Sequence, residues 1–130
     1  MSSSGLHQPG PHESAHLHVT GRARYVADEP GPAGTLFVYP VTSKVACGRI
    51  LGINIQPALD AEGVHGVYTV DDVPGENLWG PIEHTEPLFA EDRVECVGQV
   101  IAIVVAETET LARKAANRVE VDIEPQPPIL

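Results

Sequence analysis

Four carboxylates are the side chains of this sequence best suited to acid–base chemistry, and they lie close together along the chain. Residues 71–90 read DDVPGENLWGPIEHTEPLFA and include Glu83 and Glu86, and Glu91 and Asp92 follow directly. Glycosidases use two carboxylates placed on either side of a bound substrate. Such a carboxylate works as an acid or base only when burial or a neighbouring group shifts its pKa. Because this segment has the composition of a turn, the plainer interpretation is that most of these acids are solvated.

Three histidines near the start of the chain are candidate metal ligands. They are His12, His16 and His18. Neutral imidazoles bind transition metals at HxH spacing in a strand or at Hx3H spacing in a helix. The two spacings need different secondary structures, and no nearby acid or cysteine completes a tight ligand set. We therefore favour a polar arm at this end of the chain and keep a metal site as the alternative.

Trp79 and the two cysteines each have two interpretations. Beside a glycine and a proline, Trp79 is either an aromatic platform for a planar ligand or a hydrophobic pin that holds the long connection down. The pin is the favoured interpretation. Cys47 and Cys96 follow no metal-finger spacing, so we expect two buried thiols in a reducing compartment rather than a disulfide.

The balance of charge excludes several classes of partner. The chain of 130 residues has 18 acidic and 8 basic side chains, a net charge of −10. It therefore lacks the basic face that nucleic acids or anionic membranes require. Its start has neither the positive charge nor the apolar core of an export signal, and no apolar run approaches the roughly 20 residues of a membrane span. We expect a cytoplasmic protein. No GxSxG motif supports a nucleophilic serine.

The elements that must position these residues follow from apolar alternation and turn composition. Strands are expected at 21–26, 35–43, 49–55, 67–70, 97–106 and 120–124, and helices at 57–62 and 107–119. Residues 97–106 are nearly all apolar, which is typical of a central strand covered on both faces. Pro40 places the strand at 35–43 at a sheet edge or breaks it with a bulge. Thr108 is the expected N-cap of the second helix. The order predicts a mixed α/β (α+β) domain with one sheet and two packing helices.

Several motifs resemble one enzyme family, in order along the chain. PHESA followed by VTGRARYVADEP is similar to the segment that opens the molybdenum-binding portion of xanthine dehydrogenases, and TLFVYPVTSKVACGRILGINI resembles the next strand pair. DDVPGEN, EPLFA, VGQVIAIVVAE and the closing ARKAANRVEVDIEPQPPIL are the most specific matches. The resemblance covers residues 11–130. It implies the aldehyde oxidase/xanthine dehydrogenase a/b hammerhead fold, with a flexible arm at 1–18, the domain at 19–126 and the start of a linker at 127–130.

The resemblance also implies an oxidoreductase of purine metabolism, a molybdenum hydroxylase. The intact family enzyme oxidises purines or aldehydes at a molybdenum–molybdopterin centre, and electrons pass through iron–sulfur clusters to FAD. In the family, the pterin-binding residues and the catalytic glutamate lie beyond this domain. The chain is therefore expected to bind no cofactor alone and to contain no catalytic residue, and two cysteines are too few for an iron–sulfur cluster. Its expected partner is a molybdopterin-binding chain on which it docks as a split subunit or truncated copy. The alternative is a non-enzymatic interaction module of the same fold.

The resemblance gives the long connection a role. In the family, the segment corresponding to GPIEHTEP borders the funnel through which substrate reaches the metal. Trp79, Ile82 and Glu83 are therefore substrate-funnel candidates. An apolar–aromatic pair is usual at positions 82 and 83, so Ile82 fits and Glu83 departs, which implies altered selection among ring substrates. We also expect an exposed apolar patch near Ile82, Leu88 and Phe89.

Overall fold

The computed structural model describes residue 10 and residues 12–127. The chain divides into two compact units, residues 1–33 and residues 34–130, and each is considered by itself. Most of the predicted arm and the linker residues 128–130 lie outside the described residues, so the predicted limits of the arm and linker stay predictions. The described part of the first unit contains α1 (Ala15–Val19) and the 3-10 helix η1 (Val26–Asp28).

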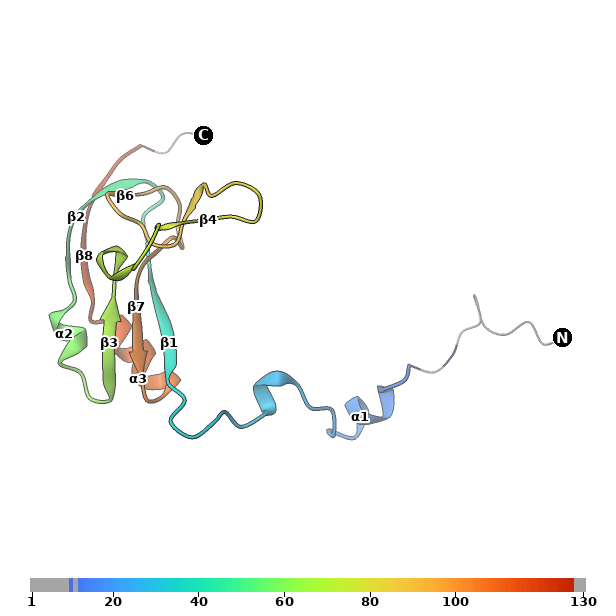
Figure 1. The fold of residues 1–130 in the computed structure, drawn as a ribbon. Coiled ribbons are helices and arrows are strands. Elements are labelled where there is room, and N and C mark those ends of the chain that lie inside the picture. Colours follow the sequence, from blue (N-terminus) through green and yellow to red (C-terminus); the bar gives the residue numbers. More distant parts are fainter. Residues whose placement is uncertain (1–9, 11, 128–130) are drawn as a thin grey trace. The chain divides into compact units, whose positions relative to one another are not determined.

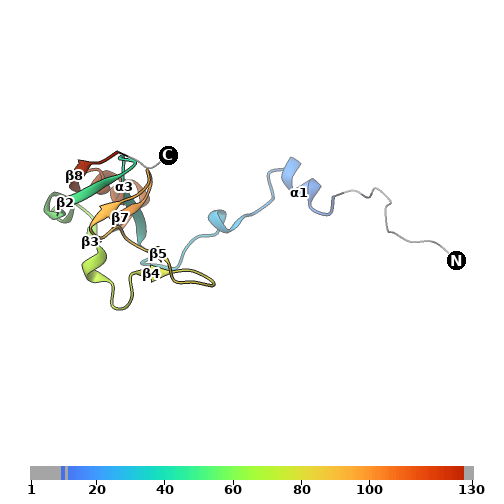
Figure 2. The same ribbon diagram turned by 90° about the horizontal axis from the view of Figure 1, so that it is seen from above.

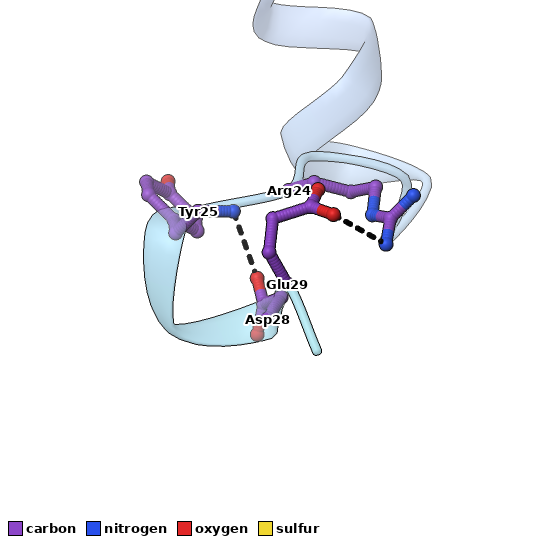
Figure 3. Close-up of polar contacts among 4 residues, drawn as sticks. All are labelled: Arg24, Tyr25, Asp28 and Glu29. Carbon is purple, nitrogen blue, oxygen red and sulfur yellow. Dashed lines mark hydrogen bonds and ion pairs between the residues drawn. The ribbon is translucent and has the colours of Figure 1, made fainter. Parts of the chain in front are cut away.

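The strand predicted at 21–26 is wrong, because a local turn replaces it. The backbone N–H of Tyr25 donates to the carboxylate of Asp28 at 2.9 Å (Figure 3). The N–H of Asp28 donates to the carbonyl of Tyr25 at the same distance. Arg24 pairs with Glu29 at 3.1 Å across this turn. An aspartate that binds nearby backbone in this way competes with strand formation. The Asp28 carboxylate therefore stabilises η1.

The second unit contains two three-stranded antiparallel sheets and a short hairpin (Figure 1). The strand order of the first sheet is β1 (Phe37–Thr42), β7 (Val100–Ala106), β3 (Val64–Tyr68). The order of the second is β6 (Arg93–Val94), β2 (Gly48–Asn54), β8 (Glu120–Pro125), and the hairpin joins β4 (Leu78–Trp79) to β5 (Glu86–Pro87).

The mixed α/β class is confirmed, but the expectation of a single sheet is wrong. β7 pairs with β1 along one edge and with β3 along the other, so both of its edges are used. β2 and β8 pair with each other along most of their length instead. β1 is an edge strand that pairs only with β7. An edge position suits Pro40, because proline has no backbone N–H with which to bind a strand on the other side.

Two clusters of buried apolar side chains form the core, and β7 contributes to both. The larger lies between the first sheet and the helices α2 (Gln56–Leu59) and α3 (Glu109–Ala116). Its buried members are Val41, Ala58, Val67, Ala102, Val104, Ala115 and Ala116. The smaller cluster buries Ala90, Val94 and Ile101. β7 is therefore central as predicted, but Ile103 and Val105 remain partly exposed, so it is covered on both faces only near its start.

The two helices of this unit are shorter than predicted. α3 is capped as expected, since the N–H of Leu111 donates to the Thr108 hydroxyl at 3.2 Å. α2 ends at Leu59, and the chain turns through Gly63, whose φ of +71° suits glycine. Among the described residues, no helix has both the length and the apolar character needed to cross a membrane.

Candidate functional site

The long connection between β3 and β7 is partly ordered rather than an irregular loop. It begins with the 3-10 helix η2 (Val70–Asp72) and then forms the β4–β5 hairpin, in which Leu78 pairs with Pro87 and Trp79 with Glu86. Figure 2 shows η2 and the hairpin on the side of the first sheet that faces away from α3. The hairpin therefore projects from the side of the first sheet that α3 does not cover.

The amide side chain of Asn77 closes the neck of this hairpin. Its Nδ2 donates to the carbonyl of Phe89 at 2.8 Å, and its Oδ1 accepts from the N–H of Phe89 at 3.0 Å. The N–H of Leu88 donates to the carbonyl of Asn77 at 2.8 Å. An asparagine side chain carries both a donating NH2 group and an accepting oxygen, so it satisfies both backbone groups of Phe89 at once. The composition of the segment gives no sign of this role, although asparagine is common where side chains bind turn backbone.

A close backbone approach shapes the tip of the hairpin. A Cβ atom on Gly80 would overlap the carbonyl oxygen of Glu83, so any larger residue would force the tip to rearrange. Glycine allows the chain to fold back over four residues at this point. The turn presents Ile82 outward, with 93% of its side chain exposed. Nearly all of the apolar surface of Ile82 is therefore in contact with solvent.

The other funnel candidates also face solvent. Trp79 is 58% exposed, so it does not act as a buried pin, and that interpretation is wrong. The Asn77 amide holds the hairpin instead. Ile82 and Leu88 are exposed and Phe89 is half-buried, so none of the three residues of the predicted patch is fully covered.

The carboxylates do not form a buried acid–base pair. Glu83, Glu86, Glu91 and Asp92 are all exposed. Glu91 and Asp92 line an open pocket of about 540 Å³ at the base of the hairpin, and Glu83 and Glu86 lie outside its lining. The four side chains therefore remain in contact with solvent. The geometry favours the solvated interpretation.

The histidines of the first unit form a small polar cluster. The rings of His12 and His18 have centroids 6.0 Å apart, and the Ser14 hydroxyl lies 3.3 Å from a ring nitrogen of each. The Tyr25 hydroxyl lies 2.9 Å from Nδ1 of His18. His16 lies on α1 together with His18, and its side chain is exposed. Within residues 10 and 12–127, no three His, Cys, Asp or Glu side chains are grouped as metal ligands, so the metal-site alternative gains no support.

The two cysteines differ in exposure. Cys47 is buried, and a guanidinium nitrogen of Arg93 lies 3.6 Å from its sulfur. Cys96 is exposed, so the expectation of two buried thiols is wrong for this residue. Cys96 lies in a turn that the Gln99 side chain closes by accepting from the N–H of Glu95 at 2.7 Å. Both thiols are free.

Residues 20–127 match a family described as aldehyde oxidase and xanthine dehydrogenase, a/b hammerhead domain. The chain belongs to this family. It is 47% identical over 119 residues to xanthine dehydrogenase 1 of Arabidopsis thaliana, covering 92% of this chain and 9% of that protein. It is 39% identical over 123 residues to aldehyde oxidase 2 of Rattus norvegicus, covering 95% of this chain and 9% of that protein. The hammerhead domain thus spans only a small part of the relatives it matches.

Solved structures agree with this assignment. The chain superimposes on a Cu,Mo-CO dehydrogenase in its carbon monoxide reduced state with a TM-score of 0.80 and 30% sequence identity. The match covers 88% of this chain and 15% of the other. The hammerhead domains of molybdenum hydroxylases therefore share this two-sheet architecture.

The described part of this hammerhead domain contains no grouped metal-ligating side chains. Its histidine, cysteine and carboxylate side chains form no group of three that could ligate a metal ion. Its carboxylates near the hairpin are exposed and spread along the segment. We therefore assign no chemical step to residues of this chain.

Proposed function

We propose that this chain is the hammerhead part of a xanthine dehydrogenase-type molybdenum hydroxylase. It would act with a separate molybdopterin-binding chain in the cytoplasm, in the oxidation of purines or related compounds. The oxidation itself is assigned to the molybdenum cofactor of that partner. The role of this chain is to shape the route by which substrate reaches the partner's active site.

The hairpin tip is the observation that carries this proposal. Ile82 is held outward on a hairpin whose neck is closed by the Asn77 amide, and 93% of its side chain is exposed. Full burial of an isoleucine side chain contributes about 1.5–3 kcal/mol, so an ordered apolar tip favours a partner surface. An ordered tip also fits a wall better than a mobile lid, because its position does not depend on substrate.

Glu83 and Trp79 give this wall a chemical character. Glu83 is adjacent to the tip and its carboxylate is exposed, so it would repel anionic substrates near the funnel entrance. Trp79 presents an exposed indole on β4 that can stack on a planar ring. We expect the assembled enzyme to favour neutral or cationic aromatic substrates over anionic purines.

The direct test is a reconstitution. The purified chain is assayed for oxidation of xanthine and of a neutral aromatic aldehyde, alone and with a molybdopterin-binding partner. We expect turnover only in the mixture, and turnover by the chain alone would overturn the proposal. A pull-down from lysate tests the alternative. If the chain recovers partners that contain no molybdopterin, an interaction module of the same fold is favoured.

The wall itself is tested by substitution in the reconstituted enzyme. Glu83→Gln keeps the shape of the side chain and removes its charge, so kcat/KM for xanthine should rise relative to that for the aldehyde. A ratio shift of about threefold or more corresponds to roughly 0.6 kcal/mol of differential stabilisation. Glu62→Gln, an exposed glutamate beyond α2, is the matched control and should leave the ratio unchanged.

A further inference from the structure

Among the described residues, one face of the β1–β7–β3 sheet has no α-helix packed on it. The buried residues of α2 and α3 cluster with Val41, Val67 and Val104, so these three side chains project to the face that the helices cover. Along each strand, successive side chains alternate between the faces. The neighbours of these buried residues therefore lie on the uncovered side.

The strand register identifies the residues of this uncovered side. Val38 pairs with Val105, and Ile103 pairs with Pro40 on one side and with Tyr68 on the other. Directly paired residues of antiparallel strands project to the same face. We call these five residues the open sheet face.

The open sheet face is apolar and accessible. Val38 is 55% exposed and Tyr68 is 43% exposed, and Ile103 and Val105 are partly exposed although they lie on the central strand. The ring of Tyr68 lies across Gly66, because a Cβ atom added to Gly66 would come within 2.8 Å of the Tyr68 hydroxyl oxygen. The phenol therefore lies over the neighbouring backbone and extends the apolar surface. No member of this face carries a charge.

We infer that the open sheet face is the surface by which this chain docks on its molybdopterin-binding partner, an inference that rests on the function proposed above. The face lies on the same side of the domain as the hairpin (Figure 2). A partner large enough to cover Ile82 at the tip therefore also reaches the sheet. The relatives contain about ten times the length of this chain, since the matched segment is 9% of xanthine dehydrogenase 1.

The charge of the hairpin segment favours a molybdopterin-binding partner over a second copy of this chain. Residues 71–95, the segment that carries the hairpin, contain eight acidic side chains and one arginine. Two copies that met through this face would bring these acids together, and like charges facing each other across an interface disfavour association. The complementary surface is an apolar patch bordered by lysine and arginine.

The test measures binding to a defined probe. The probe is the part of Arabidopsis thaliana xanthine dehydrogenase 1 that follows the segment matched by this chain, produced with its cofactor and checked for molybdenum content. Biolayer interferometry gives Kd for the chain and for Val38→Glu, which places a charge in the middle of the proposed interface. We expect binding by Val38→Glu to be at least about thirtyfold weaker, as for loss of an interface residue that carries much of the affinity.

Two controls separate the interface from general effects. Val38→Leu keeps an apolar side chain and should bind within about threefold of the unsubstituted chain. Leu51→Glu makes the matched change on β2 of the second sheet, where Leu51 is also 55% exposed, and should bind within about threefold as well. Thermal melts check folding, and if Val38→Glu lowers Tm by more than about 5 °C, Tyr68→Gln replaces it.

The outcomes distinguish the inference from the proposed function. If the unsubstituted chain binds and Val38→Glu binds equally well, or if Leu51→Glu loses as much affinity, the docking surface lies elsewhere and the inference is overturned alone. If the molybdenum-containing probe does not bind the unsubstituted chain, the proposed function fails together with the inference. Sedimentation of the chain alone provides the last check, because a dimer that Val38→Glu dissociates would assign the face to a second copy.

Discussion

Removal of the Asn77 amide should loosen the hairpin without unfolding the domain. Asn77→Ala deletes a donor 2.8 Å from the Phe89 carbonyl and an acceptor 3.0 Å from the Phe89 N–H. Each net hydrogen bond contributes about 1 kcal/mol, so the loss is about 2 kcal/mol for opening the neck. At 1.36 kcal/mol per factor of ten, this corresponds to an opening equilibrium about thirtyfold more favourable. Most of the buried core lies elsewhere and should be unaffected.

Amide hydrogen exchange resolves this opening at single residues. The amide of Phe89 should exchange about thirtyfold faster in Asn77→Ala, whereas the amide of Val104 in β7 should keep its rate, because local opening leaves global stability unchanged. Asn117→Ala is the matched control: it removes a single exposed side-chain bond to the carbonyl of Arg113 at the end of α3. Its effect should stay within that helix. An unchanged exchange rate at Phe89 in Asn77→Ala would refute the clamp.

Three further substitutions test the fold that supports the hairpin. Ile101→Ala removes a side chain that is 1% exposed, and urea denaturation should show a loss of about 3 kcal/mol, with a loss under about 1 kcal/mol contradicting its place in the smaller cluster. Thr108→Ala should cost about 1 kcal/mol through the lost N-cap, whereas Thr108→Ser should cost little; equal losses would argue against the cap. Gly80→Ala should move NMR signals of residues 78–87 and leave those of α3 in place, because its Cβ meets the Glu83 carbonyl, and an undisturbed hairpin would contradict that close approach.

The regular elements with strong local patterns could be predicted from the sequence. The apolar run of β7 and the Thr108 cap of α3 are determined mainly by neighbouring residues, and both are confirmed. The edge position of β1 is consistent with Pro40, because proline lacks a backbone N–H. The class of the fold follows from this pattern of elements.

The division into two sheets could not be predicted in the same way. Alternation indicates which residues are strands, but it does not identify their partners. Val121 of β8 and Ile53 of β2 become neighbours only through a ladder that joins distant parts of the chain. The strand predicted at 21–26 failed for a different reason, because a single Asp28 carboxylate changes the local backbone.

The segment that carries the candidate site could be recognised in the sequence. The side-chain contacts that hold this segment in place could not. Length, composition and resemblance pointed to Ile82 and its neighbours, and the structure places Ile82 at the tip of an ordered hairpin. The favoured role for Trp79 was wrong because an aromatic residue beside glycine and proline is as compatible with exposure as with burial. Asn77 was missed because its partner is the backbone of Phe89, twelve residues away, and backbone groups leave no trace in side-chain composition.

The sharing of β7 between the two clusters links the stability of the two sheets. Ile101 belongs to one cluster and Ala102, the next residue, to the other, and Val121 of β8 packs against both. Neither ladder can melt while the other keeps its full support, so we expect one cooperative transition by heat or urea. Each molecule would then have either both sheets folded or neither. No species with one folded sheet would be present to bind a partner in a wrong way.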